Sequence, residues 1–124
     1  MKMQHDMSFQ ILVDEVRPLI KELTVLQVKQ KFDNGEKFVF IDVREDHEWN
    51  VSHIPKAIHI GKGILERDIA ANISDKNSEI ILYCGGGFRS ALSAYNLQKM
   101  GYTNVASMDG GIREWNDLGF PLNK

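Results

Sequence analysis

The sequence predicts an α/β domain built on a small, open, mainly parallel sheet with helices on both faces. Short strand-like runs alternate with helix-like segments along its 124 residues. The run 80–84 (IILYC) is continuously apolar, which is typical of a strand that a parallel sheet buries on both faces. No internal repeat or Pro/Gly-rich linker divides the chain, so one compact domain is expected.

Three further strands are predicted from shorter runs. The run 38–43 (FVFIDV) is rich in β-branched and aromatic residues and follows Asn34–Gly35, a turn signal. The other two are apolar runs at 57–60 and 105–108.

Helices are predicted between the strands. Thr24 can cap a helix that continues to about Phe32, and Gly35 lies beyond its end. The strongest candidate has apolar residues at helical spacing and ends at Gly101. Including this one, the helices predicted after the first strand span 64–71, 90–100 and 112–118.

Residues 1–20 are expected to form an N-terminal extension, with the domain proper at 21–124. Apolar residues recur at roughly helical spacing over 8–17, and Pro18 ends the pattern. We therefore expect a helix that packs on the domain or on a partner. The first ten residues are polar and charges interrupt the apolar stretch that follows, so a signal peptide is not expected.

Composition excludes several classes of function. The 15 basic and 17 acidic residues give a net charge of -2 without any Lys/Arg block, which argues against a nucleic-acid surface. The longest apolar runs are far too short to cross a membrane. One cysteine cannot form an intramolecular disulfide, and a reducing cytoplasmic environment is the simplest expectation.

The turn after the run 80–84 carries the candidate site. Reactive groups in parallel α/β folds lie at the carboxyl ends of strands, where Cys84 stands. An isolated cysteine is commonly a buried small hydrophobe, but three glycines follow this one and allow backbone amides to converge on an anion. The next helix adds its positive end, which favours a nucleophilic thiolate.

Cys84 is therefore the candidate nucleophile, and Arg89 is the candidate cation that binds an oxyanion bidentately. The whole loop is assigned to substrate binding. Its members after the cysteine are Gly85, Gly86, Gly87, Phe88, Arg89 and Ser90.

Asp42 and Arg44 are expected to support the loop from the end of a neighbouring strand. They either pair with it, for example Asp42 with Arg89, or form a purely structural ion pair or turn cap. Glu48 and Trp49 are expected to pack the domain rather than contact substrate.

Three evenly spaced histidines, His47, His53 and His59, raise the question of a metal site. Their spacing fits neither a helical i,i+4 pair nor a zinc pattern. No metal site is expected, and a structural role suffices for all three.

Three motifs resemble those of the rhodanese family, and the resemblance runs from about Lys21 to Pro121. The turn CGGGFRS is similar to the family's Cys-x-x-Gly-x-Arg-Ser loop, with Cys84, Gly87 and Arg89 in register. The other motifs are 41–44 (IDVR) with 48–49 (EW) and 53–60 (HIPKAIHI) upstream, and 109–115 (DGGIREW) with Gly119 and Pro121 downstream.

The resemblance implies a small α/β fold and transfer of a sulfane sulfur. The Cys84 thiolate would attack a donor such as thiosulfate, release sulfite and become a persulfide, whose charge the loop amides would hold. A thiol or cyanide would then accept the sulfur. No metal or organic cofactor is implied.

Two alternatives remain. The family commonly has a larger, often basic or polar residue where this chain has Gly85, and the smaller residue opens the pocket. Together with the N-terminal extension, the open pocket favours the first alternative, a relay module. Such a module takes its sulfur from a protein persulfide partner and turns over free thiosulfate poorly. The related phosphatases carry one more loop residue, whereas Arg89 lies five positions after Cys84, so a phosphatase or arsenate reductase is disfavoured.

Overall fold

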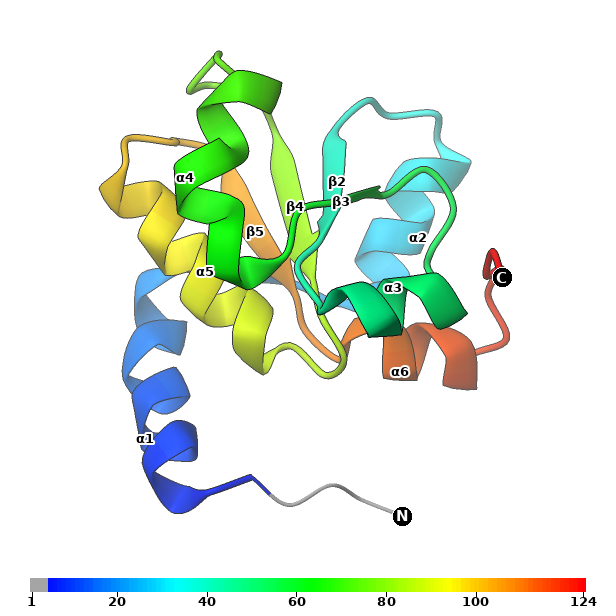
Figure 1. Ribbon diagram of the computed structural model, residues 1–124. Coiled ribbons are helices and arrows are strands. Elements are labelled where there is room, and N and C mark those ends of the chain that lie inside the picture. The colour runs from blue at the N-terminus through cyan, green and yellow to red at the C-terminus, as the bar shows by residue number, and fades with distance from the viewer. Residues whose placement is uncertain (1–4) are drawn as a thin grey trace.

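The computed structural model describes residues 5–124 as one all-parallel sheet flanked by helices (Figure 1). The strand order is β1-β5-β4-β2-β3, so β4 lies at the centre. This confirms the predicted α/β class. The strands are β1 (Lys21–Leu23), β2 (Val39–Asp42), β3 (Ile58–His59), β4 (Ile80–Tyr83) and β5 (Val105–Met108).

Helices cover both faces of the sheet, as predicted (Figure 1). Helices α4 and α5 pack on one face, with α1 alongside α5, and α2 and α6 pack on the other. The helices are α1 (Met7–Val16), a 3-10 turn (Arg17–Leu19), α2 (Val25–Asp33), α3 (Asp46–Val51), α4 (Lys62–Asn72), α5 (Phe88–Lys99) and α6 (Gly111–Asp117).

The central strand β4 explains the two-layered core. Ile80 and Leu82 belong to the apolar cluster under α4 and α5, whereas Ile81 and Tyr83 belong to the cluster under α2 and α6. All four side chains are fully buried. The continuous apolar run therefore forms a strand that is covered on both faces, as expected.

The structure agrees with the predicted helices and strands to within a few residues, but it adds β1 and α3. α1 lies where the sequence predicts an N-terminal helix over 8–17, and residues 1–4 of the extension lie outside the described residues. Within residues 5–124, no helix combines the length and the apolar character needed to cross a membrane.

Candidate active site

Cys84 follows directly after β4 and is 1% exposed. The N-terminus of α6 fixes its backbone, because the Ile112 N–H donates to the Cys84 carbonyl at 2.9 Å and the Arg113 N–H donates to the Gly85 carbonyl at 3.1 Å. This close approach requires Gly111, since a Cβ there would collide with both carbonyls. The cysteine is thus held between the starts of two helices.

The Cys84 sulfur lies in a cradle of hydrogen-bond donors. The Gly87 N–H donates to Sγ at 3.1 Å and the Ser90 N–H donates at 3.4 Å. The Ser90 hydroxyl lies 3.5 Å from the sulfur and is itself hydrogen-bonded to the Ser107 hydroxyl at 2.7 Å. Two backbone N–H groups of the loop therefore converge on the sulfur.

A pocket of about 350 Å³ opens above this cradle. It contains most of the predicted loop residues, while Gly87 and Ser90 are buried beneath and turn their amides to the sulfur. The pocket is lined by His5, Phe9, His47, Glu48, Cys84, Gly85, Gly86, Phe88, Arg89 and Arg113.

Arg89 is bound by Glu48 of α3. Its two terminal nitrogens lie 2.7 and 3.2 Å from the two carboxylate oxygens. The hydrogen bonds to Arg89 are the main reason why the pKa of Glu48 falls to about 2, and the same contact raises the pKa of Arg89. Glu48, which the sequence analysis expects to pack the domain rather than contact substrate, thus lines the pocket and binds the loop arginine.

Asp42 does not pair with Arg89. It forms a buried ion pair with Arg44, whose Nη2 lies 2.8 Å from Oδ2 and also donates to the Ser52 carbonyl at 2.7 Å. Neither residue lines the pocket. The sequence suggests either a pairing of Asp42 with Arg89 or a purely structural ion pair, and the structure shows the structural ion pair with Arg44.

Arg113 is a pocket residue that the sequence reasoning missed. A Cβ on Gly86 would lie 3.0 Å from its Nη1, and a Cβ on Gly85 would lie 3.5 Å from its Nη2 and 3.2 Å from Arg89 Nη2. Two guanidinium groups therefore lie against the glycines of the loop. The motif DGGIREW contains Arg113, but nothing local indicates that α6 turns it toward Cys84.

The three histidines do not share a site. His53 and His59 stack on Trp49 with ring centroids 3.6 and 5.1 Å away, whereas His47 lines the pocket. Over residues 5–124 there is no cluster of three or more side chains suited to a metal ion.

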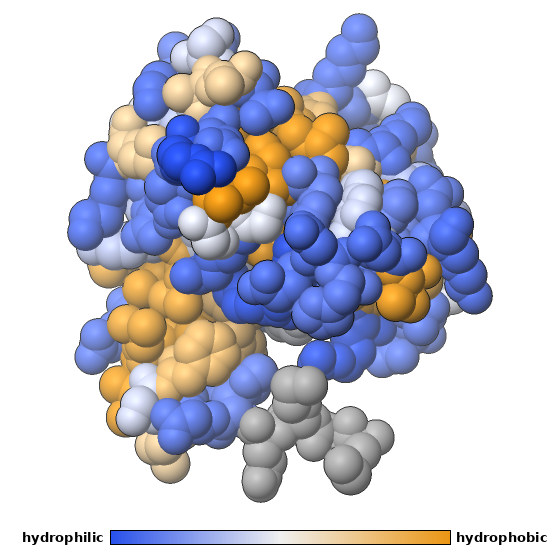
Figure 2. Space-filling view, viewed as in Figure 1, coloured by the Kyte–Doolittle hydropathy of each residue, from blue (hydrophilic) through white to orange (hydrophobic). Residues whose placement is uncertain are grey.

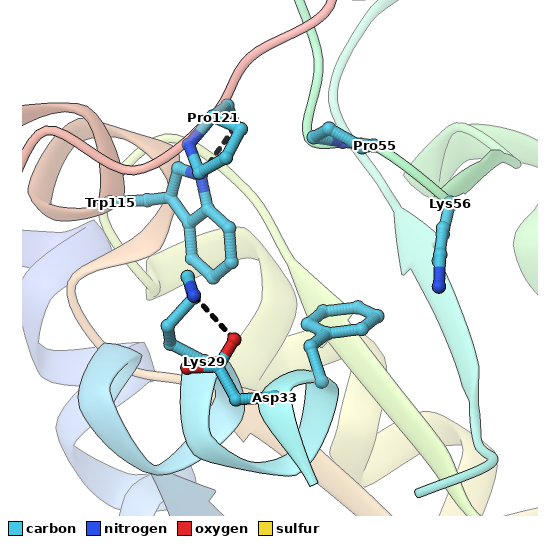
Figure 3. Close-up of a pocket in the computed structure, with 7 residues that line it drawn as sticks. Lys29, Asp33, Pro55, Lys56, Trp115 and Pro121 are labelled. Atoms are coloured by element: carbon cyan, nitrogen blue, oxygen red, sulfur yellow. Dashed lines mark hydrogen bonds and ion pairs between the residues drawn. The ribbon is translucent and has the colours of Figure 1, made fainter. Parts of the chain in front are cut away.

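A separate pocket of about 240 Å³ lies between α2, α6 and the Pro55–Lys56 turn (Figure 3). Lys29 on its rim is paired with Asp33, and Trp115 forms part of its wall. It shares no lining residue with the Cys84 pocket. Since Cys84 does not line it, it is not the candidate active site.

The CGGGFRS loop and Arg113 thus lie around one buried sulfur, and comparison with known families agrees. Residues 24–118 match the profile of the family described as Rhodanese-like domain. The chain belongs to this family. It is 33% identical over 104 residues to the putative sulfurtransferase YtwF of Bacillus subtilis, covering 84% of this chain and 98% of that protein.

A second Bacillus subtilis relative is larger. The putative sulfur carrier protein YrkF is 36% identical over 96 residues, which cover 77% of this chain but 51% of YrkF. The chain therefore spans about half the length of that relative. These similarities support a role in sulfur transfer for this rhodanese-like chain.

Solved structures agree with the fold. A protein of unknown function from Rhodopseudomonas palustris, described as a possible tyrosine phosphatase, superposes with a TM-score of 0.87 at 28% identity and covers 99% of both chains. A thiosulfate sulfurtransferase from Pseudomonas aeruginosa gives a TM-score of 0.81 at 26% identity, covering 94% of this chain and 22% of that one.

Proposed function

We propose that this rhodanese-like chain is a sulfurtransferase that carries a sulfane sulfur as a persulfide on Cys84. The observation that carries the proposal is the buried Sγ at the base of a pocket, with the Gly87 and Ser90 amides donating to it. The same amides would hold a persulfide's negative charge. The sulfurtransferase and sulfur carrier names of the relatives support this chemistry.

Thiosulfate is the proposed small donor. The Cys84 thiolate attacks the outer sulfur, a Sγ–S bond forms, and the bond to the sulfonate sulfur breaks. Sulfite leaves with the electron pair, so charge and atoms balance without a redox partner. The guanidinium of Arg113 and the loop amides provide the positive surroundings for the donor.

In the second step a thiophilic acceptor removes the sulfur. Cyanide attacks the outer persulfide sulfur and leaves as thiocyanate, while a thiol leaves as a new persulfide; either returns the Cys84 thiolate. Both steps are displacements at sulfur, for which the chain supplies one nucleophile and its surroundings. We place this chemistry in the cytoplasm, where a lone thiol stays reduced.

Turnover tests this proposal. Sulfite and thiocyanate should form from thiosulfate and cyanide with wild type, and Cys84→Ser should lose the activity while keeping its fold by circular dichroism. Full activity in Cys84→Ser would reject the cysteine's role. Efficient loading by a protein persulfide with negligible thiosulfate turnover would instead favour the relay, to which the sulfur carrier relative points.

A phosphatase is the second candidate, because the Rhodopseudomonas palustris protein is described as a possible tyrosine phosphatase. The short loop and the pairing of Arg89 with Glu48 both argue against a phosphate in the pocket. Hydrolysis of an aryl phosphate that Cys84→Ser abolishes would favour this alternative, whereas no hydrolysis would exclude such a substrate.

A further inference from the structure

The N-terminal extension contributes directly to the Cys84 pocket. His5 and Phe9 line it, although both lie before residues 24–118, which match the family profile. They reach the pocket because α1 runs alongside α5, the helix that begins with the active-site loop (Figure 1). The pocket is therefore not made by the rhodanese-like region alone.

Three rings form an aromatic wall, defined as His5, Phe9 and Phe88. The His5 and Phe88 rings stack at 4.3 Å, and the Phe9 ring lies 5.2 Å from His5 and 5.7 Å from Phe88. All three line the pocket that holds Cys84. An inorganic anion gains little binding free energy from such an apolar surface. A ligand that carries a ring or an alkyl group gains more, because it can pack against the rings.

Several contacts hold the aromatic wall in place. Val13 and Val16 of α1 are buried. The Arg17 guanidinium lies 5.1 Å from the centre of the Phe88 ring and 3.6 Å from the Asp109 carboxylate. Apolar side chains also gather over α1 at the lower left of Figure 2. The wall is therefore anchored by packing and by a cation that also contacts the domain.

The same pocket offers a place for an anion. Arg113 lies against Gly85 and Gly86 and forms no ion pair with any residue in 5–124, in contrast to Arg89, which Glu48 holds. The volume of about 350 Å³ lies in the range of small-molecule sites. A ligand with both a charged head and a carbon group matches this lining.

We propose that the pocket selects a sulfane-sulfur donor with an anionic head and an aromatic group, represented by an aryl thiosulfonate, over inorganic thiosulfate. The proposal deepens the function proposed above and rests on it for the transfer step. The Cys84 thiolate attacks the outer sulfur, a Sγ–S bond forms, and the aryl sulfinate leaves with the electron pair. The aromatic wall contacts the aryl group and Arg113 contacts the charged head.

The first test compares kcat/KM for benzenethiosulfonate with that for thiosulfate in the full chain. Wild type should prefer the aryl donor, and Phe9→Ala should lower the ratio about 3- to 10-fold because one ring contact is lost. Leu12→Ala is the matched control, since Leu12 lies on the same helix, is 49% exposed and does not line the pocket. An equal ratio in wild type and Phe9→Ala would overturn the proposal.

A binding measurement separates this inference from sulfur transfer. Unreactive benzenesulfonate and methanesulfonate are titrated into the full chain and followed by NMR. Benzenesulfonate should bind more tightly, by a margin that Phe9→Ala reduces, and Arg113→Ala should weaken both. Aryl preference without loading of Cys84 by any donor would reject the transfer function alone. Loading with no aryl preference would reject the aromatic subsite alone.

Discussion

The reactivity proposed for Cys84 depends on backbone geometry around it. Gly87 turns its amide toward the sulfur with φ of +105°, a left-handed conformation. A Cβ on this residue would also lie 3.2 Å from the Asp109 carboxylate and 3.3 Å from the Gly110 nitrogen. A side chain at this position therefore costs conformational energy and displaces a donor to sulfur.

Gly87→Ala should lower both stability and persulfide loading. An alanine in this left-handed conformation lowers the free energy of unfolding by about 1 kcal/mol, and crowding against Asp109 lowers it further. Gly101→Ala is the matched control, because its φ is +98° and a Cβ there meets nothing within 4 Å. Chemical denaturation measures the first effect and mass spectrometry the second. Equal loading in the two variants would contradict the role given to the Gly87 amide.

The loop residues were predictable because they are consecutive in sequence and their types carry the chemistry. Glu48, Arg113 and Phe9 were not, since separate helices bring them to Cys84. A glutamate on a short helix or a phenylalanine on an amphipathic one gives no local sign of its partner. Tertiary packing decides which of them reach the pocket.

At the scale of elements, α3 is a short helix with a functional contact. A capping box between Glu45 and Glu48 starts it, and the Glu48 side chain then binds Arg89 at the start of α5. The low pKa of Glu48, about 2, shows that its charged form is favoured in the folded protein. This pair links α3 to the active-site loop.

The Glu48–Arg89 pair predicts a pH-dependent stability. The folded pKa lies below the unfolded value of about 4.3, so the stabilisation is present above that pH and is lost as pH falls toward about 2. The excess stability of wild type over Glu48→Gln should therefore shrink over this interval, as measured by denaturation at each pH. Glu15→Gln is the matched control, because it makes the same substitution at an exposed residue that forms no ion pair within residues 5–124. A stability difference between wild type and Glu48→Gln that stays constant with pH would contradict the stabilising role given to the Glu48–Arg89 pair.

The short elements show where sequence patterns fail. β1 has the sequence KEL, with no apolar run, and is a strand because it pairs with the edge of β5, Glu22 opposite Ser107. α3 spans six residues, too few to show a helical period. By contrast, β4 and α5 carry patterns long and strong enough to be predicted.

At the scale of the molecule, a buried charge pair lies at the carboxyl end of the sheet. Asp42 at the end of β2 is fully buried, and Arg44 is 6% exposed. Arg44 also binds the Ser52 carbonyl and thereby ties β2 to the chain after α3. Each charge depends on the other, because a buried unpaired charge is costly.

Asp42→Asn should destabilise the whole domain by about 3 to 5 kcal/mol, since it leaves the Arg44 charge buried without its partner. Asp33→Asn should cost about 0.5 kcal/mol or less, because it removes only an exposed i,i+4 pair with Lys29. Urea denaturation of both variants measures the contrast. Equal losses would show that the buried pair contributes no more than a surface pair.

The most direct test of the sulfur-carrier account is the intact mass of the full chain before and after thiosulfate, with Cys84→Ser as the control. We expect wild type alone to gain one sulfur atom and to lose it again on addition of cyanide. No gain by a wild-type protein whose Cys84 can still be alkylated would contradict thiosulfate loading. A gain by Cys84→Ser would contradict the assignment of the carrier to Cys84.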